Sequence, residues 1–374
     1  MPRNDSIRAW RRTLPIQRRE TLLSIVADEY AHVIGVDTHA RTRTYAVLET
    51  TTGRLVASET FPTSASRMMS RALAWMLRRA NGTPLVAVEG TNSYGAGITR
   101  TLTMADVPVV EARPSKRASR AGRGKSDVIE AETAARSVPG RDTGMLIRPR
   151  AGKLRSALRV LLTARRSMDS QLTADRNALT ALVHTIDLGI DARRPRTVTR
   201  VALVAGWRIR SSDDIERAAA RRRGGPPRSQ CPGSGRSAGR KHGQSGSHVQ
   251  EMTPRLMDAP GIGPVTGAVF ITAYSHPGRV RSEAAFAAFA GAAPIPASSG
   301  NTVRYCLSRH GDRQLNSALE IVARARLAFD PTTRAYDQRR LAGGKTSREI
   351  RRLLKRYIAR QIYRQLNSAL TATP

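Results

Sequence analysis

The chain has 374 residues and carries 63 lysines and arginines against 29 acidic residues, a formal net charge of +34. This length predicts two or three domains, and the charge favours a polyanion such as DNA or RNA over a small metabolite. A membrane surface is a weaker alternative, because no apolar run approaches the roughly 20 residues of a bilayer span. The two cysteines lack the paired spacing of a zinc or disulfide framework, which fits a reducing cytoplasm. Charge alone also leaves open a basic binding protein without catalysis.

Residues 1–29 are basic and lack a sustained apolar pattern, so we expect a flexible arm outside the fold. Residues 30–145 then show three short β-rich runs followed by strand–helix alternation, which predicts an α/β domain that begins with an antiparallel meander. The expected strands cover residues 32–39, 44–49, 54–61, 84–89 and 107–112, and the expected helices cover residues 64–80 and 94–104.

Residues 146–210 have a helical apolar period that begins at Leu154, with Arg165 and Asp175 interrupting it. The pattern fits a coiled-coil-like arm or an ordinary helix pair packed on a core. Residues 211–251 follow, and from about Arg221 to Ser247 they are rich in Gly, Pro, Ser and Arg. Such a stretch cannot bury enough apolar surface to order itself, so it is a basic linker or an out-of-frame piece of coding sequence.

Residues 252–374 predict a mainly helical domain, with helices over 256–273 and 283–289 and an amphipathic helix near the C-terminus. Thr346 and Glu349 have the spacing of a capping box at the start of that last helix. Its apolar face is expected to contain Ile350, Leu353, Leu354, Tyr357, Ile358 and Ile362.

Four acidic residues of the α/β domain stand at positions that suit a metal site. Asp37 and Glu89 end two predicted strands, so both can emerge at one edge of a sheet. Asp127 and Glu130 are three residues apart and share one helix face. Each acid alone is typical of a surface or capping position. Together, in so basic a chain, they predict a divalent-metal site that could hold two Mg²⁺ ions for phosphodiester chemistry.

The segment Pro-Gly-Ile-Gly-Pro-Val-Thr-Gly (260–267) has the form of a helix-hairpin-helix turn, in which Gly261 and Gly263 would bring backbone amides to a DNA phosphate. A glycine connector between helices is the equal alternative. Further on, Ser298 and Ser299 precede Gly300, with Arg304 close by. A serine nucleophile needs an activating base or metal, and none is evident locally, so a simple turn is the usual interpretation of these residues alone.

Six ordered segments resemble the DEDD-type insertion-sequence transposases, the RuvC-like and serine-assisted recombinases that a bridge RNA guides. The resemblance covers roughly residues 30–210 and 252–368. The segments are Val-Ile-Gly-Val-Asp-Thr-His (33–39), Val-Glu-Gly-Thr-Asn-Ser-Tyr-Gly-Ala-Gly (88–97), Arg-Gly-Lys-Ser-Asp-Val-Ile-Glu-Ala-Glu (123–132), Pro-Gly-Ile-Gly-Pro (260–264), Phe-Ala-Gly-Ala-Ala-Pro-Ile-Pro-Ala-Ser-Ser-Gly (289–300) and Arg-His-Gly-Asp-Arg-Gln-Leu-Asn (309–316).

The resemblance implies an RNase-H-like (RuvC-like) first domain whose four acids, Asp37, Glu89, Asp127 and Glu130, bind Mg²⁺, with Mn²⁺ as a substitute. It also implies a DNA-attacking serine that matches Ser298, with Ser299 as the adjacent alternative. The implied protein is a cytoplasmic, nucleoid-associated bacterial transposase. Its partners would be DNA, a guide RNA and further copies of the chain in a dimer or tetramer. Lys125 and Arg304 join Gly261 and Gly263 as candidate DNA contacts.

Two departures from the family pattern affect these expectations. Glu130 stands where the family usually has aspartate, and its longer side chain alters the spacing of bound ions. Residues 221–247 replace a helix that leads back from the coiled coil, so we hypothesise a partly decayed copy. A RuvC-like nuclease or junction resolvase, which needs the acids but no serine, is the enzyme alternative. An inactive DNA-binding relic is the non-enzyme alternative.

Overall fold

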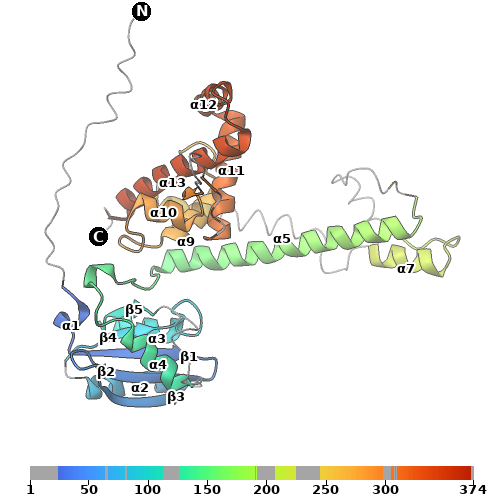
Figure 1. The fold of residues 1–374 in the computed structure, drawn as a ribbon. Coiled ribbons are helices and arrows are strands. Elements are labelled where there is room, and N and C mark those ends of the chain that lie inside the picture. Colours follow the sequence, from blue (N-terminus) through green and yellow to red (C-terminus); the bar gives the residue numbers. More distant parts are fainter. Residues whose placement is uncertain are drawn as a thin grey trace, which may run out of the picture. The chain divides into compact units, whose positions relative to one another are not determined.

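The structure, a computed structural model, describes residues 24–63, 66–80, 82–112, 126–189, 191, 207–224, 245–297, 305–306, 308 and 310–371. The chain divides into two compact units, Met1–Arg150 and Ala151–Pro374. The first unit is a mixed α/β domain and the second is almost entirely helical (Figure 1). Among the described helices, none combines the length and the apolar character needed to cross a bilayer.

Unit 1 contains a five-stranded sheet with the order β3-β2-β1-β4-β5. The first three strands form the predicted antiparallel meander, and β4 and β5 continue the sheet in parallel with β1. This arrangement confirms the predicted RNase-H-like fold class. The elements are α1(Val26–Glu29), β1(His32–Thr38), β2(Thr42–Glu49), β3(Leu55–Pro62), α2(Ser66–Arg79), β4(Leu85–Val88), α3(Ala96–Met104), β5(Val109–Glu111), α4(Asp127–Arg136) and the 3₁₀ turn η3(Thr143–Met145).

Helices cover both faces of this sheet because β1 and β4 are apolar on both sides. One face packs against α2 and α3, through residues such as Trp75 and Leu102. The other face packs against α4, through Ala134 and Ala135. Within α2 the side chains of Trp75 and Met76 are buried, whereas that of Leu77 is 43% exposed.

The predicted N-terminal arm, residues 1–29, extends too far into the chain. Val26 is fully buried in the core beneath α4, and its amide donates to the Arg141 carbonyl. Ile25 also forms an isolated β-bridge with Asp142. Residues 24–29 therefore belong to the folded unit because later parts of the chain supply the partners, which local sequence could not reveal. Residues 1–23 lie outside the described part of the chain.

Unit 2 is built around one helical core. Leu158 and Leu162 of its long first helix join residues such as Phe270, Leu319 and Ile358 in that core. The elements are α5(Lys153–Thr185), α7(Ile215–Gly224), α9(Pro264–Tyr274), α10(Glu283–Phe289), β6(Ile295–Pro296), β7(Tyr305–Cys306), α11(Arg313–Phe329), α12(Pro331–Ala342) and α13(Ser347–Thr371).

The long helix α5 matches the predicted helical period, but only its beginning is packed. Its N-terminal turns contact α9, and α7 contacts it further along, whereas residues 171–178 are exposed on every side (Figure 1). Leu172 is 48% exposed. Within this chain the helix therefore combines a base packed on the core with an exposed arm, and the coiled-coil-like alternative stays a prediction for the exposed part.

The predicted low-complexity linker contains helical residues at both ends. Helix α7 extends to Gly224, and residues 245–252 are helical again, with Ser245 buried. Arg221 is buried and its Nε donates to Asp213, while its guanidinium lies 5.7 Å from the centroid of the Trp207 ring. Residues 225–244, the centre of the hypothesised frameshift, lie outside the described residues.

Two helix starts in unit 2 can be compared with the predictions from sequence. The expectation of a helix from residue 256 was wrong, because residues 253–263 form turns and α9 starts only at Pro264. The capping box at α13 is confirmed, because Thr346 N and Glu349 N each donate to the other residue's side chain. The predicted face of α13 is buried at Ile350 and Ile358, but Tyr357 is half exposed and stacks edge-on against Tyr336.

Candidate active site

The ends of two parallel strands bring Asp37 and Glu89 to one edge of the sheet. Strand β1 pairs with β4 so that Val36 lies beside Val88, which leaves Asp37 and Glu89 as the next neighbours. The Glu89 amide donates to the Val36 carbonyl, and the Glu89 carbonyl accepts from Thr38 Oγ1. Side chains alternate along a strand, so Asp37 shares the face of Gly35 and Glu89 shares the face of Ala87. Both acids therefore belong to the face that α4 covers.

Helix α4 reaches this edge because Gly35 lets it lie directly on β1. A Cβ built on Gly35 would lie 1.9 Å from the Ala131 carbonyl oxygen, so no larger residue fits without moving the helix. Ser126 caps the helix by accepting from the Ile129 amide, and Asp127 and Glu130 occupy its first turn. The close contact therefore fixes the acidic end of α4 above the end of β1.

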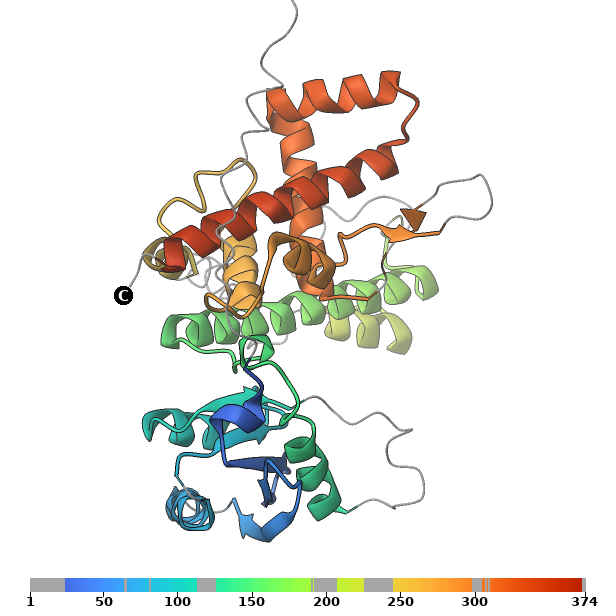
Figure 2. The same cartoon turned by 60° about the vertical axis from the view of Figure 1, so that its left-hand side comes forward.

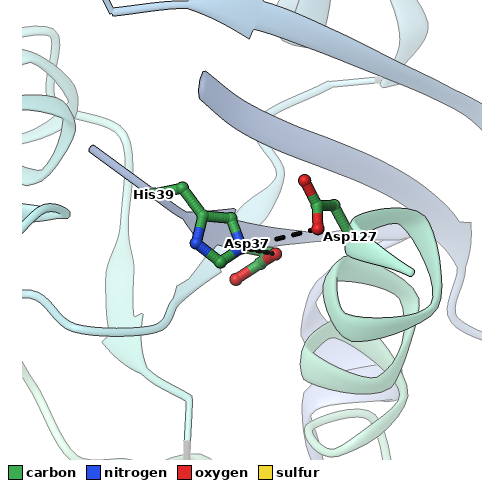
Figure 3. Close-up of side chains that lie close together, drawn as sticks. All are labelled: Asp37, His39 and Asp127. Atoms are coloured by element: carbon green, nitrogen blue, oxygen red, sulfur yellow. Dashed lines mark ion pairs between the residues drawn. The ribbon is translucent and has the colours of Figure 1, made fainter. Parts of the chain in front are cut away.

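Three ligand atoms converge at this point: a carboxylate oxygen of Asp37, the imidazole of His39 and a carboxylate oxygen of Asp127 (Figure 3). All three lie within 4.8 Å of one another. His39 Nε2 is 3.0 Å from Asp37 Oδ2 and 3.5 Å from Asp127 Oδ1. His39 was not among the residues predicted for the site. Its signal was present, because His39 follows Asp37 by two residues and an extended strand places such residues on one side.

The surroundings of Asp37 oppose ionisation of its carboxyl group. Burial raises the pKa of Asp37 above its ordinary value; His39 lowers it, and the negative charges of Glu130 and Asp127 raise it further. Asp37 is only 4% exposed, and neither its Oδ2 nor His39 Nε2 makes a hydrogen bond of normal geometry. Inward-facing oxygen and nitrogen donors of this kind fit a divalent cation, which would offset the repulsion among the carboxylates.

The four predicted acids do not all join this cluster. Glu130 is close enough for its charge to raise the pKa of Asp37, but it is outside the group of three converging atoms, as is Glu89. Glu111, at the end of β5, accepts a hydrogen bond from Thr91 Oγ1. Its register beside Val88 places it on the opposite sheet face from Asp37 and Glu89.

The predicted serines lie outside the described residues, as do Arg304 and Lys125. Their surroundings are described on both sides, where Ile295 and Pro296 pair antiparallel with Cys306 and Tyr305 (Figure 2). Residues 297–304, which include Ser298 and Ser299, thus connect two paired strands. The base of this hairpin is closely packed: the Asn316 amide donates to the Ala290 carbonyl at 2.7 Å, and a Cβ on Gly311 would meet the Phe289 carbonyl at 2.7 Å.

Of the glycines in the predicted turn, one packs against α11 and the other helps to start α9. Gly261 has a φ of +78° and lies against α11, where an added Cβ would come within 3.1 Å of Ala325 and of the Val322 carbonyl. The Gly263 amide donates to Thr266 Oγ1 at the start of α9. That amide is therefore already engaged with Thr266.

Comparison with known proteins agrees with this architecture. Residues 34–187 match a family profile described as "Transposase", of the DEDD type found in IS110, and residues 253–338 match the "Transposase IS116/IS110/IS902 family". Over 96 residues the chain is 35% identical to the "Insertion element IS110 uncharacterized 43.6 kDa protein" of Streptomyces coelicolor. That segment is 25% of this chain and 24% of the relative, so it spans about a quarter of either. The two profiles together cover most of the chain, which belongs to the IS110 family of transposases.

Proposed function

We propose that this protein is a DNA transposase that cuts and rejoins strands to move an insertion sequence. The convergence of Asp37 and Asp127 from a strand end and a helix start, inside a chain of net charge +34, is the observation that carries the proposal. Asp37, Glu89, Asp127 and Glu130 are the proposed metal-binding acids. A divalent ion held there, Mg²⁺ by family resemblance, would polarise the scissile phosphate and favour ionisation of the attacking hydroxyl.

The proposed nucleophile is Ser298, with Ser299 as the adjacent alternative. Its Oγ forms a bond to the DNA phosphorus while one phosphorus–oxygen bond of the backbone breaks. The serine proton passes to water, and the departing sugar oxygen takes up a proton. A hydroxyl from another DNA strand then attacks the phosphoserine, which releases the serine and rejoins the DNA. The paired strands β6 and β7 support this assignment, because a hairpin can present its connecting residues to a substrate.

The proposal includes partners that the family resemblance implies. The serine of unit 2 would act with the acids of unit 1 from a second copy, in a dimer or tetramer. A structured guide RNA would select the DNA by base pairing, so the protein would need only backbone contacts. Gly261, Gly263, Lys125 and Arg304 are the proposed contacts to DNA. The strongly basic composition supports binding of two polyanions.

A cleavage assay on DNA that carries the element ends tests the proposal, with RNA transcribed from the flanking sequence and divalent metal added. We expect strand cleavage and a covalent protein–DNA adduct from the unmutated chain. Asp37→Asn should abolish both, and Ser298→Ala should abolish the adduct unless Ser299 is the nucleophile. Glu59→Gln, at an exposed position of β3, is the matched control and should remain active. Binding of DNA and RNA without any cleavage would support an inactive, decayed copy instead.

A RuvC-like nuclease or junction resolvase is the second candidate. It is favoured by the location of the Asp37, His39 and Asp127 cluster wholly within unit 1, where it needs no serine from elsewhere. The same variants separate the two functions. A nuclease would cleave with Ser298→Ala and with Ser299→Ala, and it would form no covalent adduct at any stage.

A further inference from the structure

We infer that His39 is itself a metal ligand and makes this site a mixed carboxylate–imidazole centre, which binds a divalent transition-metal ion such as Mn²⁺ in preference to Mg²⁺. The inference rests on the proposed metal site but goes beyond it, because the acids alone would predict an all-oxygen Mg²⁺ site. It adds a ligand, His39, and a preference among metal ions that the four acids alone would not produce.

The spacing of the donor atoms supports a shared ion. Bonds of about 2.1 Å at right angles around an octahedral ion would separate neighbouring ligand atoms by about 3.0 Å. His39 Nε2 lies 3.0 Å from Asp37 Oδ2 and 3.5 Å from Asp127 Oδ1. Small side-chain adjustments would therefore bring all three donors to one ion. Figure 3 shows dashed lines from the imidazole to both carboxylates, with Asp37 on β1 and Asp127 on α4.

A simple ion pair accounts less well for the same geometry. The buried pair Arg221–Asp213 illustrates the contrast, because Arg221 Nε donates a hydrogen bond to Asp213 at 3.1 Å. Asp37 Oδ2 and His39 Nε2 are equally close, yet both are buried atoms without a hydrogen-bond partner of normal geometry among the described residues. Asp37, which is 96% buried, aims this oxygen into the cluster. Buried polar atoms that are left unsatisfied in this way are expected where an ion completes the site.

The donor type sets the ion preference. Mg²⁺ is a small, hard ion that is usually held by carboxylates, phosphates and water, whereas imidazole nitrogen binds first-row transition-metal ions more strongly, with Mn²⁺ the weakest of that series. One imidazole among carboxylates thus improves binding of a transition-metal ion more than binding of Mg²⁺. The neutral imidazole also adds a donor without adding a negative charge to Asp37, Asp127 and Glu130, which already repel one another.

The test titrates Mn²⁺ and Mg²⁺ into the full, metal-stripped chain and compares the dissociation constants. Pulsed electron paramagnetic resonance of the Mn²⁺ form should reveal modulation from a directly bonded imidazole nitrogen. His39→Ala and His39→Gln should remove that signal and weaken Mn²⁺ binding by about 10- to 100-fold, the range seen even for outer-shell partners, with a smaller effect on Mg²⁺. His32→Ala, at the opposite end of β1, is the matched control and should change neither.

The outcomes separate this inference from the proposed function. If Asp37→Asn abolishes binding of both ions but the unmutated chain lacks the nitrogen signal, His39 is no ligand and the acidic metal site stands. If neither ion binds in a manner that depends on Asp37, the proposed metal site itself is overturned. The nitrogen signal is measured on the unmutated chain, so the inference remains testable even if a His39 variant fails to fold.

Discussion

A Cβ added to Gly35 of β1 would lie 1.9 Å from the carbonyl oxygen of Ala131 in α4. Backbone meets backbone at this point, and the helix that carries Asp127 and Glu130 is held directly above β1, which carries Asp37 and leads into His39. The geometry of the candidate active site therefore depends on a residue that has no side chain.

Gly35→Ala should separate α4 from β1. Overpacking of this kind typically costs about 1–3 kcal/mol, and the backbone contact here favours the upper end. We expect a lower melting temperature of unit 1 and weaker Mn²⁺ binding, because Asp127 moves away from Asp37. Gly140→Ala is the control, since an added Cβ there meets nothing within 4 Å. Scanning calorimetry and metal titration measure the two effects; unchanged metal affinity in a folded Gly35→Ala protein would contradict this account.

Asp37→Asn should raise the stability of the metal-free protein and abolish metal binding. Asp37 is buried and its neighbours Asp127 and Glu130 carry like charge, so the metal-free fold is destabilised by an ionised carboxylate at this position. The amide removes that charge. We expect a higher melting temperature without metal and loss of the stabilisation that divalent ions confer on the unmutated chain. Thermal unfolding with and without Mn²⁺ measures both effects. The idea fails if Asp37→Asn melts lower in the absence of metal.

Glu283 should make unit 2 sensitive to acid. Burial raises the pKa of Glu283, but the hydrogen bonds and charges of Arg360 and Arg364 outweigh burial, so its pKa lies below its ordinary value of 4.5. Both guanidinium contacts are 2.9 Å long and join α10 to α13. A lowered folded-state pKa stabilises the fold above the ordinary value, and this stability is lost as the pH falls below about 4.5 towards the folded-state pKa.

Glu283→Gln is therefore expected to lower stability at pH 7 and to have little effect once the pH is below the folded-state pKa. The arginines are 41% and 61% exposed, so screening limits the loss to about 1 kcal/mol. Glu216→Gln, on the exposed side of α7, serves as the comparison. Melting curves between pH 3 and pH 7 should converge for Glu283→Gln and the unmutated chain at the acid end only.

Asn316→Ala should loosen the base of the β6–β7 hairpin. Asn316 donates to the Ala290 carbonyl and accepts from Lys355 Nζ at 3.1 Å; Lys355 is 8% exposed and also pairs with Glu320 at 3.4 Å. Removal of the amide leaves a buried carbonyl and a buried ammonium short of one partner each, which costs about 1–3 kcal/mol. Gln338→Ala on exposed α12 is the control. Chemical denaturation measures the difference, and equal stability of the two variants would refute the role of Asn316.

Much of the sheet of unit 1 was accessible from sequence because β1, β2 and β4 are buried along most of their length and short turns join β1 to β2 and β2 to β3. The strand ends at Asp37 and Glu89 followed directly from that pattern, and the parallel pairing of β1 with β4 confirmed their common edge. The helix predicted from residue 256 starts later in the structure: Leu256, Ala259 and Ile262 reach the core of unit 2 from turns, and the chain becomes helical only at Pro264.

By itself the sequence determined the basic character, the five strands of the sheet in unit 1, the capping of α13 and the candidate acids, because these depend on composition and on periods of two and 3.6 residues. Only the tertiary structure decided which side chains meet. His39 joined the site because α4 lies close enough on Gly35 to bring Asp127 to it, and Val26 joined the core because residues 138–146 return to cover it. Such contacts join residues far apart in the chain, and the local sequence pattern does not indicate which distant residues will meet.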